Sequence, residues 1–492
     1  MSHQQTMELA LRLAQAGRLV EAERLYQQIL ARTPDATAHN NLGQLLNLLG
    51  RHEQAITELR RAIALRPDLA EPHNNLGIAL AAVGKMDEAI AAYRTTIALQ
   101  PNHARAHSNL GNALKTDGET TEAIAYYRKA LSLESNYAEA HSNFGALLNE
   151  IGDAEEALKH HRRAIELRPD YAEAHSNLGS ALSRLGRHDE AIAAHRRAIS
   201  LQPEFPQAHF NLALELLMRG DFAEGWTEYE WRCRMPGLVK IRRDYPQPLW
   251  DGTDLGERVL LLYAEQGIGD TIQFVRYVPS IRGRVLLEVQ PSLGRLLNAA
   301  TPHDGEFDVH LPLLSLPLIL SQFEPTATQV PYIRPISRQG IGPRHGLRVG
   351  VAWAGSATHK NDRNRSIPLE KLAPLAQDGV EFFSLQVGTS TNQTGMGLTD
   401  LTDSLHDFSD TAALIAELDL VISVDTAVAH LAGAMGKLVW VLLPEPADWR
   451  WLRRREDSPW YSTMRLFRQS RPRDWDEPIA RMSQELAKFK SQ

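Results

Sequence analysis

Apolar and polar positions in the first half of the chain repeat every 34 residues. Glycines at the same spacing suit turns between helices, because a left-handed backbone is cheap for glycine, and alanines mark where a second helix packs closest. The pattern therefore predicts stacked helix pairs. Five copies read small residue or proline, histidine, polar residue, asparagine, large apolar residue, glycine, and the sixth has Phe210 at the polar position and Ala213 in place of the glycine. The copies lie at 38–43, 72–77, 106–111, 140–145, 174–179 and 208–213.

A period of this length is typical of a tetratricopeptide (TPR) solenoid. We expect an α-solenoid of about seven helix pairs over residues 1–239, with an out-of-phase first repeat acting as a cap. The last repeat is degenerate, since Gly225 replaces the packing alanine and Trp226, Tyr229 and Trp231 follow it. These aromatic side chains are expected to dock the solenoid on the next domain.

Two polar ladders follow the first helices of the repeats. Neighbouring helices lie ~8–10 Å apart, whereas metal ligands lie ~2 Å from their ion. The histidines at 39, 73, 107, 141, 175 and 209 are therefore interpreted as packing residues. An asparagine amide both donates and accepts hydrogen bonds, so an asparagine row could bind the backbone of an acceptor peptide in the concave groove. The alternative is that Asn-Leu-Gly is simply a common sequence at this position of TPR repeats and does not mark a peptide-binding row. The asparagine ladder comprises Asn41, Asn75, Asn109, Asn143, Asn177 and Asn211, and it resembles that of the O-GlcNAc transferase TPR array.

The second half changes to short apolar runs that alternate with helical patterns. A linker rich in proline and aromatic residues, 240–256, leads into a short lobe at 257–340. A second lobe with a charged tail is expected at 341–492. Strand-like runs are found at 258–263, 285–289, 347–353, 381–386, 420–424 and 438–443. This alternation predicts a pair of Rossmann-type α/β lobes.

Candidate ligand-binding residues follow these runs, where open α/β sheets bind their ligands. Gly267 and Gly269 permit close approach to the backbone before a helix. Ser356, Lys360 and Arg363 belong to a polar, cationic loop whose charges could neutralise a phosphate or simply be solvated. Asp425, Thr426 and Ala427 begin a helix whose exposed N–H groups predict a phosphate seat. Gln386 follows a strand and is a candidate contact to a nucleoside.

Composition excludes several classes of function. A net charge of −7 gives no support for binding nucleic acid or an anionic membrane. The single cysteine, Cys233, cannot form an internal disulfide and suits a reducing cytoplasm. The N-terminus lacks the pattern of a signal peptide, and no apolar run reaches the ~18–20 residues of a membrane helix. We therefore expect a cytoplasmic protein without membrane insertion.

Three segments carry a resemblance to a known family. These are the Gly-Ile-Gly-Asp-Thr turn at 267–271, the Trp-Ala-Gly-Ser loop at 353–356 with Lys360, and the segment 425–437 that contains Asp425, Thr426 and His430. Residues from roughly 258 to 469 resemble the ADP-heptose:lipopolysaccharide heptosyltransferases, which are glycosyltransferases of GT-B fold. Together with the repeats, the chain resembles bacterial TPR-glycosyltransferases, a group that includes flagellin-modifying enzymes.

The resemblance implies sugar transfer from a nucleotide sugar, with inversion and without a metal or other cofactor. It implies Asp270 as the catalytic base, although this carboxylate would also suit a helix cap, and Glu265 and His430 are alternative bases. The implied donor and phosphate site comprises Gly267, Gly269, Thr271, Ser356, Lys360, Arg363, Gln386, Asp425, Thr426, Ala427 and His430.

Three functions remain open at this point. The first is a glycosyltransferase whose solenoid captures a protein acceptor, with a flagellin-like protein as one candidate. The second is a glycan or lipid-precursor glycosyltransferase whose repeats bind a partner, because the first lobe is short for an acceptor domain. The third is a non-catalytic scaffold that binds a nucleotide sugar. ADP-, UDP-, GDP- and CMP-linked donors all fit the sequence.

Overall fold

The computed structural model describes residues 2–235, 241–299, 306–326, 330–335, 340–356, 361–388 and 396–490. Within it the chain forms two compact units, Met1–Pro203 and Glu204–Gln492. None of the helices described has the length and apolar character needed to cross a bilayer.

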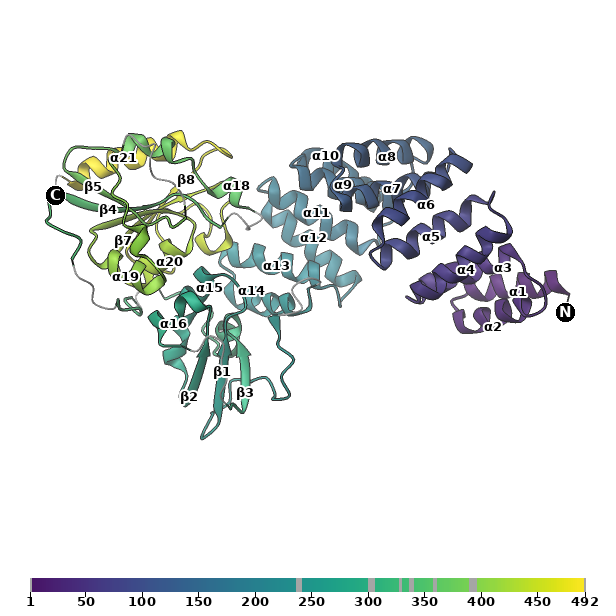
Figure 1. The fold of residues 1–492 in the computed structure, drawn as a ribbon, viewed down its shortest axis with the longest axis horizontal. Helices are drawn as coiled ribbons and strands as arrows, with labels where there is room; N and C mark the ends of the chain where they lie inside the picture. Colours follow the sequence, from purple (N-terminus) through teal and green to yellow (C-terminus); the bar gives the residue numbers. More distant parts are fainter. Residues whose placement is uncertain are drawn as a thin grey trace. The chain divides into compact units, whose positions relative to one another are not determined.

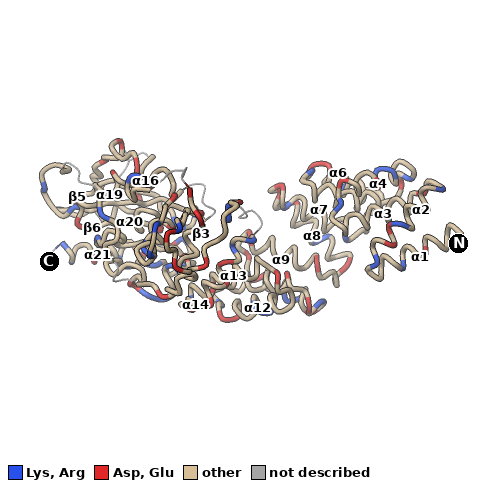
Figure 2. The backbone as a smooth tube through the Cα atoms, turned by 90° about the horizontal axis from the view of Figure 1, so that it is seen from below, with Lys and Arg blue, Asp and Glu red and all other residues tan. Residues whose placement is uncertain are grey.

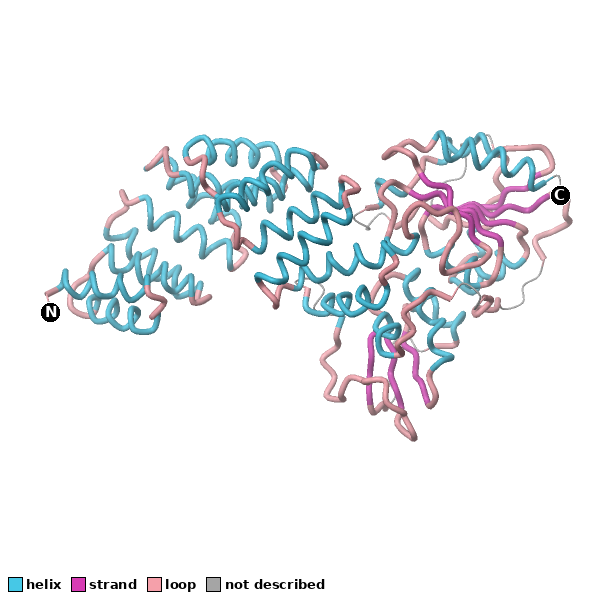
Figure 3. Tube along the Cα trace, turned by 180° about the vertical axis from the view of Figure 1, so that it is seen from behind, coloured by secondary structure: helices cyan, strands magenta, loops and turns pink. Residues whose placement is uncertain are grey.

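The first unit consists of helices that pack as successive pairs (Figure 1). Cyan helices and short pink connections alternate throughout it (Figure 3). The helices are α1 (His3–Gln15), α2 (Leu19–Leu30), α3 (Ala36–Leu48), α4 (His52–Leu65), α5 (Ala70–Ala82), α6 (Met86–Leu99), α7 (Ala104–Asp117), α8 (Thr120–Leu133), α9 (Ala138–Ile151), α10 (Ala154–Leu167), α11 (Ala172–Arg184) and α12 (His188–Leu201).

Glycines on α3, α5, α7, α9 and α11 set the distance at which each of these helices crosses the second helix of its pair. A Cβ added at any of them would lie 2.5–3.1 Å from a large side chain on the second helix, so only glycine permits this approach. The five contacts join Gly43 to Leu59, Gly77 to Tyr93, Gly111 to Tyr127, Gly145 to His161 and Gly179 to His195. The pairs α9–α10 and α11–α12 thus place a histidine where the pairs α5–α6 and α7–α8 place a tyrosine.

The histidine ladder binds the chain's own turns. His73, His107 and His175 each place Nε2 2.9–3.2 Å from the carbonyl oxygen of the proline six residues earlier. His141 makes the same contact to Ser135 at 3.1 Å, while the first rung, His39, pairs with Glu58 at 2.6 Å. These contacts support the interpretation of the ladder as packing residues.

Charged residues of both signs are distributed along the helices (Figure 2). Several partly or fully exposed ion pairs join neighbouring repeats, among them Arg51 with Glu23 at 2.8 Å and Arg60 with Glu88 at 3.0 Å. Exposed pairs of this kind contribute ~0–1 kcal/mol each, so the apolar seams between helices dominate the stability.

We predict that acid destabilises the first unit through its buried histidines. Burial lowers the pKa of His161 to about 3, and burial together with His141 lowers that of His160 to about 4. In the unfolded chain these histidines have a pKa of ~6.5 and bind protons as the pH falls below that value, whereas in the folded chain they remain neutral. The free energy of unfolding of the first unit is therefore at its full value above pH ~6.5 and falls toward lower pH, by up to ~1.4 kcal/mol per pH unit for His161.

Urea unfolding followed by far-UV circular dichroism between about pH 7.5 and about pH 5 measures this loss. His161→Phe keeps an aromatic ring against Gly145 but cannot titrate, so it should flatten the pH dependence. An unchanged slope in that variant would show that the loss arises elsewhere.

The second unit begins with α13 (Pro206–Arg219), α14 (Phe222–Tyr229) and the 3-10 helix η1 (Glu230–Arg234). A parallel three-stranded sheet of order β2-β1-β3 follows, with β1 (Val259–Tyr263), β2 (Arg284–Glu288) and β3 (Val309–Pro312). Its connections contain α15 (Ile268–Phe274), η3 (Val275–Ser280), α16 (Pro291–Leu297), η4 (Leu313–Ser315) and α17 (Leu316–Ile319).

The other sheet is parallel and has the order β5-β4-β6-β7-β8. Figure 3 shows the two sheets as separate groups of magenta strands. The strands are β4 (Leu347–Ala352), β5 (Val380–Ser384), β6 (Leu420–Val424), β7 (Leu438–Leu443) and β8 (Met464–Arg468), and the helices are α18 (Asp362–Arg365), η5 (Leu369–Leu375), η6 (Thr402–Ser404), α19 (Phe408–Ala416), α20 (Ala427–Ala434), η7 (Trp449–Trp451) and α21 (Asp476–Lys490). The fold class predicted for this half, α/β, is confirmed, and β3 and β8 were not among the predicted strands.

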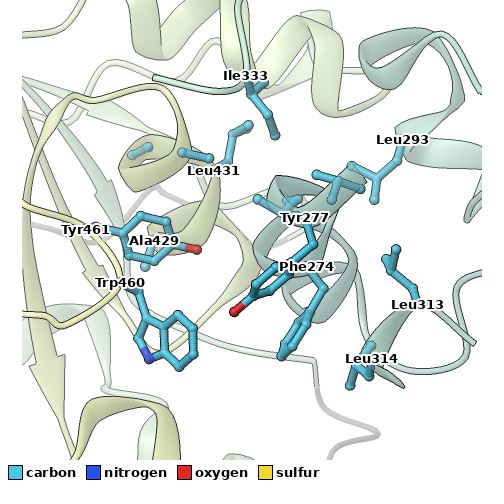
Figure 4. Close-up of a cluster of buried hydrophobic side chains, with 14 of the residues drawn as sticks. Phe274, Tyr277, Leu293, Leu313, Leu314, Ile333, Ala429, Leu431, Trp460 and Tyr461 are labelled. Carbon is cyan, nitrogen blue, oxygen red and sulfur yellow. The ribbon is translucent and has the colours of Figure 1, made fainter. Parts of the chain in front are cut away.

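One hydrophobic core joins the two sheets and the last helix pair. Figure 4 shows side chains from α15 and η3 (Phe274, Tyr277) beside those from α20 and the segment before β8 (Leu431, Trp460). Trp226 of α14 is buried in the same core, where its indole meets Phe274 and Trp449 edge-on and Nε1 donates to the Phe323 carbonyl at 3.1 Å. The tryptophan thus packs α14 on both lobes.

Candidate active site

A cavity of about 890 Å³ opens at the carboxyl ends of the parallel strands. The segment after each of five strands contributes to its wall, so the cavity belongs to both sheets. These segments are 266–270 after β1, 354–356 after β4, 385–387 after β5, 425–428 after β6, and 444 with 446–450 after β7. The position agrees with the general rule for ligand sites in open α/β sheets.

The two lobes meet in this cavity where α15 approaches α20. A Cβ on Gly269 would lie 3.0 Å from Cδ2 of His430, so the glycine permits the approach. His430 Nδ1 lies 3.0 Å from the Tyr461 hydroxyl, and its ring stacks on Trp451. Burial lowers the pKa of His430 to about 3, which keeps the imidazole neutral at pH 7.

Asp270 lines the cavity and forms part of a buried polar network. Its Oδ2 accepts from the backbone N–H of Gly267 at 2.9 Å, and its Oδ1 pairs with Arg450. Arg450 is 8% exposed and also donates to Asp448 at 2.8 Å and to Gln273 at 3.0 Å. The carboxylate therefore has the predicted cap-like contact and also faces the cavity. Sequence reasoning missed Arg450, because only the fold brings η7 against α15.

The helix α20 presents its N-terminus to the cavity. Thr426 precedes the helix in extended conformation, and no side chain of the described residues caps it. Arg365 also lines the cavity and donates to the Asp425 carbonyl at 3.2 Å, with its guanidinium over Gly355. Burial, reinforced by Asp448, raises the pKa of Asp425 to about 6. A cation and free N–H groups together form a seat that favours an anion.

The other predicted donor residues are placed in different surroundings. Ser356 lines the cavity, and so does Gln386, whose Oε1 accepts from the Ala354 N–H at 2.9 Å. Thr271 is buried outside the lining and donates to Gln290 at 2.9 Å. Arg363 is exposed outside the lining, two residues before the cavity-lining Arg365. Lys360 lies outside the described residues.

Glu265, the alternative base, is also outside the cavity lining. Its side chain is 1% exposed and forms an ion pair of 2.9 Å with the buried Arg232. Burial raises the pKa of Glu265 to about 7 against the opposing effect of Arg232. Glu265 and Arg232 therefore act as a buried pair that ties η1 to the end of β1.

The asparagine ladder bonds successive repeats to one another. The amide nitrogens of Asn75 and Asn109 donate to the side chains of Asn40 and Asn74 at 3.0 and 3.1 Å. Asn177 makes the corresponding contact to Ser142 at 3.4 Å. Each donor thus reaches the residue that precedes the asparagine of the previous copy, and at these rungs one of the two amide N–H groups bonds within the array. The other predicted rungs, Asn41, Asn143 and Asn211, are half-buried on α3, α9 and α13.

Comparison with known proteins identifies the repeats. Models of the tetratricopeptide repeat match residues 43–84, 74–143, 136–204 and 184–229. Protein FlbA of Caulobacter vibrioides is 27% identical over 326 residues, covering 56% of this chain and 54% of that protein. The chain thus spans about half the length of this curated relative.

Solved structures resemble the helical part. MamA is 29% identical with a TM-score of 0.29, covering 32% of this chain and 91% of that chain. TTC0263, a TPR protein of Thermus thermophilus, is 24% identical with a TM-score of 0.34, covering 37% of this chain and 100% of that chain. On the family models, residues 43–229 of this chain are tetratricopeptide repeats, the type of array that binds protein partners.

Proposed function

We propose that the chain is a glycosyltransferase that moves a sugar from a nucleotide-sugar donor to a hydroxyl group of a protein recruited by its repeats. The observation that carries the proposal is that Asp270 of one lobe and the N-terminus of α20 of the other face the same cavity. At about 890 Å³ the cavity falls within the range of ligand sites, ~300–1,000 Å³. The resemblance to GT-B glycosyltransferases supports the same assignment.

In the proposed reaction, the two lobes that line the cavity have different roles. The acceptor oxygen forms a bond to the anomeric carbon, and its proton passes to Asp270. The bond from that carbon to the phosphate oxygen breaks, and its electron pair leaves with the nucleotide. Arg365 and the first N–H groups of α20 receive the developing negative charge, as preorganised donors do in other transferases. Attack and departure on opposite faces give inversion.

The repeats supply the acceptor in this proposal. TPR arrays are protein-interaction surfaces, and the first unit is joined by its own backbone to the unit that holds the cavity. A protein bound to the array is present at high effective concentration near the cavity, which increases transfer without a new contact.

A second candidate, a scaffold that binds a nucleotide sugar without transferring it, is favoured by one observation. Both carboxylate oxygens of Asp270 already have partners, Arg450 and the Gly267 N–H. Each oxygen retains a further lone pair for an incoming hydroxyl, so these bonds are compatible with a base as well.

A donor screen separates the candidates. The chain is incubated with radiolabelled ADP-, UDP-, GDP- and CMP-sugars and a bacterial protein extract, and nucleotide release and labelled protein are measured. A transferase of the proposed kind yields both products. A scaffold binds the nucleotide but releases none, and a lipid or glycan transferase labels the organic phase or a free glycan instead.

We predict that Ala427→Pro weakens nucleotide diphosphate binding by roughly tenfold or more, because it removes one N–H donor to a charged phosphate. Proline suits the first position of a helix, and Thr426 before it has the extended backbone that proline requires (φ −142°, ψ 171°). Isothermal titration with ADP, UDP and GDP measures the change.

Ala427→Ser retains the N–H and should bind as wild type does. Equal affinities of the proline and serine variants would remove the seat at α20 from the proposal.

A further inference from the structure

The last repeat differs from the others at the position before the ladder asparagine. This position is polar in five copies and becomes Phe210 in the sixth. In three of those copies the polar side chain accepts the hydrogen bond from the next repeat, as Asn40, Asn74 and Ser142 do. Phe210 can accept no such bond. In the sixth copy, an aromatic ring therefore stands where earlier copies have the hydrogen-bond acceptor for the asparagine of the next repeat.

Phe210 lines the cavity together with Leu214 and Met218. The three residues are spaced by four along α13, so they form one face of the helix. All three are half-buried: they pack against the hydrophobic core of the second unit and also line the cavity. Glu215, which is 4% exposed, pairs with Arg453 at 3.3 Å and holds α13 against the segment after η7.

This apolar face belongs to the Asp270 side of the cavity. The Phe210 ring lies 5.6 Å from the Tyr229 ring, and the Tyr229 hydroxyl accepts from Gln266 Nε2 at 3.1 Å. Gln266 directly precedes Gly267, whose N–H donates to Asp270. The phosphate seat, in contrast, is built from the segments after β4 and β6 and from Arg365.

We infer that Phe210, Leu214 and Met218 form a subsite for an apolar side chain next to the accepting serine or threonine of a polypeptide. The inference rests on the proposed function and names the substrate feature that the cavity selects. An apolar wall beside the base offers no hydrogen bonds to a sugar acceptor. The flexible Met218 lets the subsite accept apolar side chains of different shape.

The test uses synthetic peptides that differ only beside one central serine, carrying leucine, serine or aspartate there, with the donor found in the screen. For the wild-type chain we expect kcat/KM to favour the leucine peptide over the serine peptide by about tenfold, the effect of burying one such side chain. Phe210→Ser, which restores the residue of earlier copies, and Met218→Gln should lower this ratio toward one. Phe210→Leu should retain it.

The ratio within each variant separates recognition from folding, because a purely structural defect lowers kcat/KM for all peptides equally. Ile78→Ser, at an exposed apolar position of α5, is the matched control and should leave the ratio unchanged. Transfer by the wild type without a preference for leucine, or a ratio unaffected by Phe210→Ser, overturns this inference but leaves the proposed function standing. Transfer to a lipid acceptor and to no peptide also overturns it. Failure to turn over any donor overturns the proposed function and this inference with it.

Discussion

Replacement of Asp270 by asparagine is expected to slow sugar transfer by about 10²–10⁴-fold, the usual contribution of a positioned base. The amide keeps the size of the carboxylate and an oxygen that can accept from Arg450, but it cannot take the proton of the acceptor hydroxyl. Nucleotide affinity should change little, because the phosphate seat is built from other segments. Initial rates with the donor from the screen, together with titration by the nucleotide, measure both quantities.

Asp378→Asn makes the same chemical change at an exposed position outside the cavity lining and should retain full activity. Full transfer by Asp270→Asn would show that Asp270 serves the fold rather than the reaction. Asp425, whose pKa is raised to about 6 by burial and which also lines the cavity, would then be the next carboxylate to examine.

Trp226→Ala is expected to destabilise the second unit by about 3–5 kcal/mol, the range for deleting a buried aromatic side chain. The indole is 1% exposed, packs edge-on against Tyr229, Phe274 and Trp449, and loses its bond to the Phe323 carbonyl. All nine tryptophans lie in residues 204–492, so tryptophan fluorescence during urea unfolding reports on this unit alone.

Trp231→Ala is the matched control. Trp231 is half-buried and stacks on His209 with ring centroids 3.8 Å apart, a contact worth ~0.5–1.5 kcal/mol. Equal losses in the two variants would contradict the central place of Trp226 in the core.

Features set by neighbouring residues were predictable from the sequence. The 34-residue period predicts the helix pairs, because each glycine, alanine and proline acts on its own turn or crossing. The strands β4, β6 and β7 follow from apolar runs buried on both faces. In contrast, β3 is a four-residue strand that contains Pro312, and its pattern alone does not distinguish it from a loop.

The cavity shows the limit of such reasoning. Gly267, Gly269, Asp270, Gln386 and Thr426 were predicted individually, because strand–turn–helix patterns mark positions where ligands bind. Arg450 and Phe210 were not, since nothing in their local sequence indicates that they line one cavity with the loop after β1. Their roles depend on contacts between segments about 180 and 60 residues apart.

The repeat array, the α/β character of the second half and the turns that carry candidate chemistry follow from the amino-acid sequence alone, because these properties depend on periodicity and on residues close in the chain. Only the folded chain shows which of those turns share a cavity, that three ladder asparagines bond repeat to repeat, and which side chains of the two lobes the expected docking residue Trp226 contacts. The reason is physical: hydrogen bonds and side-chain packing act over a few ångströms in space, and only the folded chain brings distant segments within that range.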